Sequence, residues 1–431
     1  MEQAIYGANV NHGDISGSYN NIGLVYSNLG EYEKSLEYHT KSLAMSQATY
    51  GANANHGDIA GSYNNIGSVY SDLGEYEKSL EYHTKSLAMQ KAVYGANTNH
   101  SYIVSSYNNI GLVYSHLGEY EKSLEYHTKS LAMQKAVYGA NTNHSYIVSS
   151  YNNIGLVYSH LGEYEKSLEY HTKSLSMQQA IYGTNANHGV IANSYNNIGS
   201  VYRNLGEYKK SLEYYTKSLA MQQAVYGANA NHSHIANSYN NIGSVYSSLG
   251  EYEKSLEYHT KSLAMKQAIY GTNAHHSDIA NSYNNIGSVY RNLGEYKKSL
   301  EYYTKSLAMQ QAVYGANANH SHIANSYNNI GSVYSGLGEY EKSLEYHTKS
   351  LAMKQAIYGT NAHHSDIANS YNNIGSVYRN LGEYKKSLEY YTKSLAMQQA
   401  VYGANANHSH IANSYNNIGS VYSVWVSMKS L

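Results

Sequence analysis

A four-residue motif, Tyr-Gly followed by Ala or Thr and then Asn, recurs ten times along this 431-residue chain. The first copy begins at Tyr6, the last begins at Tyr402, and each step is 44 residues. A fixed period of this length is typical of arrays in which similar helical or strand units stack on their neighbours. The period therefore predicts one continuous array, although the length alone would suggest two or three domains.

Each unit has the pattern of two helices joined by a glycine. In the copy from 191 to 226, one face of the first helix is formed at spacing i, i+3, i+4, i+7 by Tyr195, Ile198, Gly199 and Tyr202. Gly206 is expected to end this helix in a left-handed conformation. The hydroxyl of Ser233, and of its equivalents in other copies, is expected to cap the start of the next first helix.

The second helix is expected to begin at Glu207 and to end at Gly227. Its apolar stripe consists of Tyr208, Leu212, Tyr215 and Leu219. Ser211 and Ser218 fall on the same stripe, where their small size lets a neighbouring helix approach. We expect their buried hydroxyls to bond the carbonyl four residues earlier. Because the apolar faces of one hairpin cannot cover each other completely, each unit must stack on the next.

The spacing of these aromatic, glycine and small residues resembles the tetratricopeptide signature, and the 44-residue unit is similar to repeats of the kinesin light chain-like type. The likeness covers essentially the whole chain. It departs where the family has His-Pro and this chain has His-Ser or His-Gly, where small Ala positions are Ser, and where the second-helix aromatic is often His, as at His39 and His83. The resemblance implies an all-α, right-handed superhelical solenoid of tandem helix-turn-helix repeats.

The repeats divide the chain into three parts. Residues 1–10 are predicted to be the end of a second helix and a linker, residues 11–406 nine tandem hairpins, and residues 407–431 the first helix of a tenth repeat with a divergent tail. Val424, Trp425 and Val426 in that tail are expected to be exposed. Since neither end carries a polar capping unit, we expect a fragment of a longer protein and self-association through the uncapped ends.

A pair of asparagines recurs in every first helix, on the face opposite Tyr195 and Tyr202. In tetratricopeptide arrays this face lines the concave groove, so the resemblance implies a ligand surface. A carboxamide both donates and accepts hydrogen bonds, and a row of them could pair with the backbone of an extended or short helical peptide. The predicted peptide-binding residues are Asn65, Asn109, Asn153, Asn197, Asn241, Asn285, Asn329, Asn373, Asn196, Asn240, Asn284, Arg203, Arg291 and Arg379.

Two alternatives to this groove remain open at the level of sequence. Tandem duplication copies a residue whether or not it is used, so the asparagines could form a passive solvated face. The array could also be a structural spacer or sensor arm of a larger signalling protein, without a ligand of its own. The three arginines recur every 88 residues and do not converge, which disfavours a carboxylate clamp of the kind that binds chaperone tails.

Composition and motifs limit the remaining functions. The formal net charge is −1, there is no cysteine, and no apolar run is long enough to span a membrane. We therefore expect a protein or peptide partner, with no nucleic acid, membrane, metal or cofactor, and a cytoplasmic location. Histidines in the linkers, such as His232 and His234, are interpreted as exposed linker residues. No catalytic motif is present, so no enzyme is predicted. We expect the inward His39 and its equivalents to destabilise the array when the pH falls below about 6.

Overall fold

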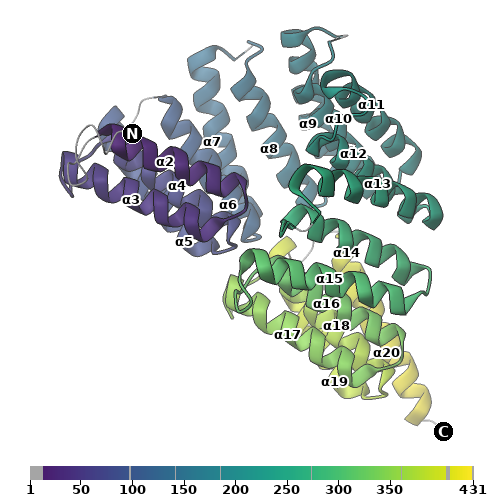
Figure 1. The fold of residues 1–431 in the computed structure, drawn as a ribbon. Coiled ribbons are helices and arrows are strands. Elements are labelled where there is room, and N and C mark those ends of the chain that lie inside the picture. Colours follow the sequence, from purple (N-terminus) through teal and green to yellow (C-terminus); the bar gives the residue numbers. More distant parts are fainter. Residues whose placement is uncertain are drawn as a thin grey trace. The chain divides into compact units, whose positions relative to one another are not determined.

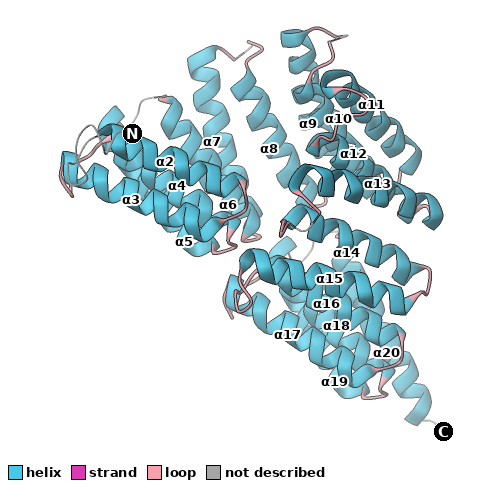
Figure 2. Ribbon diagram, viewed as in Figure 1, coloured by secondary structure: helices cyan, strands magenta, loops and turns pink. Residues whose placement is uncertain are grey.

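The computed structural model describes residues 13–96, 99–140, 142–184, 186–272, 274–360, 362–403 and 408–429. All regular secondary structure in these ranges is α-helical, as Figure 2 shows. This confirms the predicted helical solenoid. The predicted partial repeat at residues 1–10 lies outside the described residues.

The helices fall into two compact units, residues 1–157 and 158–431, which we describe separately (Figure 1). The first unit contains α2 (Gly13–Asn28), α3 (Tyr32–Tyr50), α4 (Gly57–Asp72), α5 (Tyr76–Tyr94), α6 (Ser101–His116), α7 (Tyr120–Tyr138) and most of α8 (Ser145–His160). The second unit contains α9 (Tyr164–Tyr182), α10 (Gly189–Asn204), α11 (Tyr208–Tyr226), α12 (Ser233–Ser248), α13 (Tyr252–Tyr270), α14 (Ser277–Asn292), α15 (Tyr296–Tyr314), α16 (Ser321–Gly336), α17 (Tyr340–Tyr358), α18 (Ser365–Asn380), α19 (Tyr384–Tyr402) and α20 (Ser409–Lys429).

Within each unit, an even-numbered first helix packs against the odd-numbered second helix that follows it, and the glycine between them makes the turn. Gly206 has φ +76°, and its N–H donates to the carbonyl of Arg203 at 3.0 Å. The N–H of Glu207 donates to the carbonyl of Tyr202 at 2.9 Å. This pair of bonds satisfies the last carbonyls of the helix and needs a left-handed residue, which glycine adopts without strain. The predicted end of the first helix is confirmed.

The start of each first helix differs from the prediction. The residue that caps α12 is His232 and not Ser233, which is already the first helical residue. The Nδ1 atom of His232 accepts a hydrogen bond from the backbone N–H of His234 at 3.3 Å. Its ring also stacks on Tyr226, the last residue of α11, with 3.6 Å between centroids. One imidazole thus satisfies an orphan amide and closes the linker, so a hydroxyl cap is not needed.

The core of each repeat combines aliphatic residues of the first helix with one large ring of the second. In α10, the side chains of Ile191, Ile198 and Val201 are buried. Tyr215 of α11 is 1% exposed, and its ring carbons lie 3.0–3.2 Å from where a Cβ on Gly199 would stand. Glycine therefore lets the helices approach closely at this crossing, since a side chain here would require the Tyr215 ring to move by a few tenths of an ångström. The predicted apolar stripe is confirmed.

The buried serines bind across the hairpin rather than along their own helix. Ser211 Oγ donates to the carbonyl of Gly199 at 2.7 Å, and Ser218 Oγ donates to the carbonyl of Ala192 at 2.8 Å. The expectation of a bond to the carbonyl four residues earlier was wrong for both. The close approach of the helices at Gly199 brings facing carbonyls within reach, so the hydroxyls hold the two helices together.

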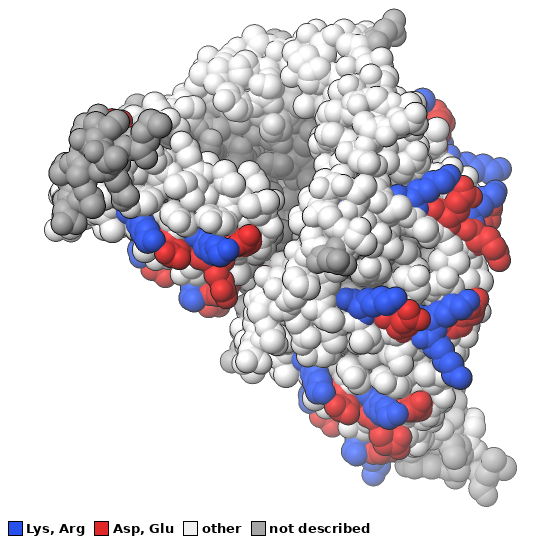
Figure 3. Space-filling view, in the orientation of Figure 1, with Lys and Arg blue, Asp and Glu red and all other residues white. Residues whose placement is uncertain are grey.

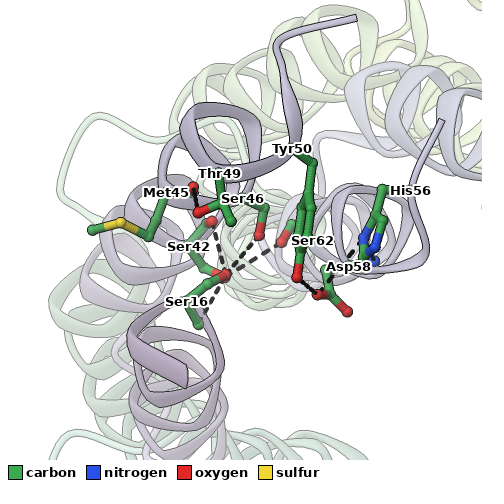
Figure 4. A network of polar contacts seen from close by, with 9 residues as sticks. All are labelled: Ser16, Ser42, Met45, Ser46, Thr49, Tyr50, His56, Asp58 and Ser62. Atoms are coloured by element: carbon green, nitrogen blue, oxygen red, sulfur yellow. Dashed lines mark hydrogen bonds and ion pairs between the residues drawn. The ribbon is translucent and has the colours of Figure 1, made fainter. Parts of the chain in front are cut away.

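A small polar network also links successive repeats. Ser238 Oγ of α12 donates to Gln222 Oε1 of α11 at 2.7 Å, and the same bond recurs from Ser106 to Gln90 and from Ser326 to Gln310. In the first copy Ser46 stands at the glutamine position and bonds within its own hairpin, 2.6 Å from Ser16 Oγ, while Ser42 Oγ lies 3.3 Å from Ser62 Oγ of the next repeat (Figure 4). All of these side chains are buried, so each bond replaces hydration that folding removes.

Charged residues gather on the outward faces of the second helices (Figure 3). Lys217 and Glu213 form the predicted i,i+4 pair at 2.6 Å, and Lys210 pairs with Glu207. Both lysines also lie over tyrosine rings. None of the helices in the described ranges combines the length and the apolar character that crossing a membrane requires.

Candidate functional site

The asparagine face lies on the side of each unit where successive repeats approach most closely. The first helices of neighbouring repeats contact one another directly, α2 with α4, α4 with α6, α10 with α12, and α12 with α14. Within each unit, second helices such as α3, α5, α11 and α13 pack between two first helices. The first helices therefore line the inner side of the curve within each unit, and their paired asparagines are half-buried there. The predicted groove face is on this inner side.

The asparagines of neighbouring repeats bind one another. Within one unit, Nδ2 of the second asparagine donates to Oδ1 of the first asparagine one repeat earlier. The bonds are Asn65 to Asn20 (3.3 Å), Asn109 to Asn64 (2.8 Å), Asn285 to Asn240 (2.7 Å), Asn329 to Asn284 (2.8 Å), Asn373 to Asn328 (2.7 Å) and Asn417 to Asn372 (2.8 Å). The repeated amides thus form a ladder that joins the repeats. The sequence analysis did not predict this structural role.

Buried histidines of the second helices complete this ladder. His259 Nδ1 lies 3.0 Å from Asn240 Oδ1, which also accepts from Asn285. His83, His127 and His347 make the same contact with the first asparagine of their own repeats. Burial lowers the pKa of these four histidines and of His171 to about 4, so they are neutral at pH 7. A neutral imidazole with its proton on Nδ1 is the donor that Asn240 requires.

Not every predicted site residue belongs to the ladder. Within each unit, no amide–amide hydrogen bond of the ladder is found for Asn153, Asn197 or Asn241 among the described residues. Asn196 Oδ1 is buried and has no hydrogen-bond partner among the described residues. In its repeat the second-helix ring is Tyr215, which cannot reach the amide as histidine does. The amides that the ladder leaves open are therefore concentrated around Asn196 and Asn241.

The three predicted arginines stand beside the three buried tyrosines. Burial raises the pKa of Tyr215, and the guanidinium of Arg203 and a hydrogen bond with Ser200 oppose that rise. Tyr303 and Tyr391 have the same neighbours in their repeats. In the described part of the chain, every Lys or Arg that pairs with a carboxylate is a lysine on a second helix. These arginines are therefore half-exposed cations without a carboxylate partner among the described residues, and Arg379 Nη1 donates to Ser420 Oγ at 3.5 Å.

Two lysines in the core were not predicted. Lys266 and Lys354 occupy the position where six copies have glutamine, and each is 3% exposed. The Nζ of Lys266 lies 3.4 Å from the carbonyl of Asp278, and burial lowers its pKa. Ser262 Oγ, one turn earlier, has no partner in the described structure. The burial of these two lysines could have been predicted from the sequence, because their position falls on the inward side of the second helix.

The linker histidines were interpreted as exposed, and this was wrong for His320 and His364, which are buried against Tyr314 and Tyr358. Their stacking and capping roles account for their position. Among the residues that the structure describes, no three His, Cys, Asp or Glu side chains gather closely enough to hold a metal ion.

Comparisons with known proteins agree with this architecture. The profile of the tetratricopeptide repeat matches residues 14–92, 58–136, 102–180, 190–268, 278–356 and 366–423. No curated protein matches the sequence.

Several solved structures are similar to the chain. BtubC (BKLC) from P. vanneervenii is 18% identical, with a TM-score of 0.42, over 57% of this chain and 93% of that one. A Podosopora anserina kinesin light chain with nearly identical TPR-like repeats is 17% identical, with a TM-score of 0.42, over 50% and 97%. A Rap protein complexed with Competence and Sporulation Factor is 12% identical, with a TM-score of 0.55, over 90% and 99%. The repeat profile covers most of the sequence, and the chain belongs to the tetratricopeptide repeat family.

Proposed function

We propose that the array is an adaptor whose first-helix face binds an extended or short helical segment of another protein. Tetratricopeptide repeat proteins generally mediate contacts between proteins, and the Rap protein of similar fold was solved with Competence and Sporulation Factor bound. A cytoplasmic location remains a prediction from the sequence.

One observation carries the proposal, namely where the nearly identical copies differ. In the first helix, apart from its first residue and one buried position, all differences fall on the asparagine face, for example Leu112 against Ser244 and Ser247 against Arg203. In the second helix, the twelve positions from Tyr208 to Leu219 differ at two positions only, and four of the seven that follow, 220, 222, 223 and 225, also differ. Both faces are exposed, so tolerance of exposed positions does not account for the contrast. Diversification of one face is expected if that face meets a ligand.

The chemistry of the face in the second unit indicates the kind of segment. Asn241 offers an amide outside the ladder, and Asn196 Oδ1 lacks a donor. Arg203, Arg291 and Arg379 lack carboxylates in the described structure. A peptide backbone can bond the free amides, and carboxylates of the partner can pair with the guanidinium groups. We therefore propose a polar segment with acidic residues as the ligand of this unit.

A selection from a displayed peptide library tests the proposal. Peptides selected on the wild-type chain should bind the Arg203→Ser, Arg291→Ser, Arg379→Ser triple variant at least tenfold more weakly, since a charged interfacial pair typically contributes ~1–3 kcal/mol. Serine is the matched replacement because alternate copies carry it, as at Ser247 and Ser335. A Glu257→Gln, Lys261→Gln variant on the outward face is the control and should bind normally. If no peptide is enriched, the spacer interpretation is favoured.

Self-association is a separate prediction. Helix α20 exposes Tyr415, Tyr422, Val424 and Val426, which confirms the predicted exposure of the two valines, whereas Trp425 is half-buried. We propose that a second copy can cover this face. Sedimentation should show a concentration-dependent dimer that the Val426→Ser variant weakens, and a wild-type chain that stays monomeric would contradict it.

A further inference from the structure

A cavity in the first unit lies between α6, α7 and the beginning of α8. It contains about 330 Å3 of space that opens to solvent on one side. Part of this volume is open solvent, so the enclosed space is small and suits a single side chain. Its lining contains no Lys, Arg, Asp or Glu and consists of Asn99, Ser101, Val104, Ser105, Asn108, Gln134, Val137, Tyr138 and Tyr146.

One wall of the cavity is aromatic. The ring of Tyr138 stacks on His144 with 3.6 Å between centroids, and Tyr146 follows at 5.3 Å from His144. Tyr146 is nevertheless 52% exposed, and neighbouring Val137 is also exposed. Large apolar side chains that stay in water beside a concave site are a mark of a binding surface.

The polar groups of the lining are largely occupied within the protein. Gln134 Oε1 accepts from Ser150 Oγ at 2.9 Å, and Asn108 Oδ1 contacts His127 Nδ1 at 3.2 Å. The Nδ2 of Asn108 has no partner in the described residues. The cavity therefore presents apolar walls beside the amides of Asn99 and Asn108. That combination fits an uncharged side chain next to a backbone carbonyl.

The combination of Val104 with Tyr146 occurs only once in the sequence. At the position of Tyr146, later copies carry Val190, His234 or Asp278, and most copies carry alanine where this one has Val104. The substitutions are adjacent in space and all add apolar surface. We propose that this cavity selects the partner by taking one aliphatic side chain, such as leucine, from the bound segment. The inference rests on the proposed adaptor function and names the residue class that its first unit recognises.

The cavity itself is tested with a small probe. We would titrate N-acetyl-leucine methylamide into the whole chain with labelled valine methyl groups, assigned through Val104→Ala and Val137→Thr variants. The methyl signals of Val104 and Val137 should shift at millimolar probe, and the Tyr146→His variant should weaken this binding about fivefold to tenfold through loss of the aromatic wall. Tyr102→His, the same change outside the lining, is the control and should bind normally. Histidine stands at this position in three other copies, so both variants are expected to fold.

Several outcomes would overturn the proposal. Unshifted valine signals would show that the cavity does not bind the probe, and stronger shifts with the aspartate or tryptophan methylamide would contradict the aliphatic choice. The library selection gives a second readout, in which one aliphatic position should be enriched on wild type and on Tyr102→His but not on Tyr146→His. If peptides are enriched but share no aliphatic position, the proposed role of the cavity is contradicted and the adaptor function is still supported. Probe binding without any enriched peptide would remove the adaptor function and leave the cavity as a small-molecule site.

Discussion

At the scale of single residues, the buried lysines are the weak points of an otherwise well-paired core. In copies with glutamine, Oε1 accepts from a serine of the next repeat, as at Gln222 and Ser238. Lysine has no acceptor, so Ser282 turns to the carbonyl of Asp278 and Ser262 Oγ is left without a partner. A buried ammonium with one contact, 3.4 Å from a carbonyl, is poorly compensated for lost hydration.

We expect Lys266→Gln to raise the free energy of unfolding by roughly 1–2 kcal/mol, because it removes a buried charge and restores two hydrogen bonds. The pKa of Lys266 is lowered in the fold from 10.5, so the cost of its proton is complete below the lowered value and vanishes above 10.5. The advantage of the variant should therefore shrink as the pH approaches 10.5. Urea denaturation at two pH values measures both effects.

The reverse change is the control for this prediction. Gln222→Lys places an ammonium at the equivalent site and should destabilise the chain by a similar amount. Equal midpoints for wild type and Lys266→Gln at pH 7 would show that the buried ammonium is compensated in a way that the contacts do not reveal.

At the scale of elements, the linker histidine sets the start of each first helix. His232 combines a cap to the N–H of His234 with a stack on Tyr226. His232→Ala removes both and should cost roughly 1–2 kcal/mol, whereas His232→Asn keeps a capping acceptor and should recover about half of that. Chemical denaturation of the two variants measures how much of the stability loss comes from the cap and how much from the ring stack. Equal stability of both variants would indicate that the ring stack alone matters.

At the scale of the whole molecule, the histidine–asparagine ladder makes stability depend on pH. The pKa of His83, His127, His171, His259 and His347 is lowered to about 4, below the ordinary 6.5. The unfolded chain takes up these protons as the pH falls through 6.5, whereas the fold resists them until about 4. Stability is therefore expected to fall between pH 6.5 and 4, by up to roughly 3 kcal/mol for each histidine. The pH range of this stability loss extends to lower pH than the sequence alone suggested.

Thermal unfolding from pH 7 to pH 4 tests this dependence. A variant with His83, His259 and His347 changed to tyrosine, the residue of alternate copies, should lose stability less steeply with acid. Parallel curves for wild type and variant would show that these histidines do not carry the pH dependence.

The sequence predicted the hairpins and the glycine turns, because both depend on periodicity within one copy, whereas the asparagine groove came from the family resemblance and stays a prediction. It did not predict the contacts between elements. Ser211 bonds across the hairpin, His232 stacks on the preceding helix, and Asn285 pairs with Asn240 one repeat away. Such partners depend on how closely helices approach, and a 44-residue period does not specify that distance. For the same reason the cavity beside Tyr146 could not be recognised from residue spacing.

The central claim is that the first-helix face, and not the outward face of the second helices, is the ligand surface. A photoreactive residue placed at Asn237, on the first-helix face, or at Thr260, on the outward face, tests this most directly, since both positions are exposed. After irradiation with a peptide selected on the wild-type chain, the account predicts a covalent adduct from position 237 and none from position 260. An adduct from position 260 alone would contradict it.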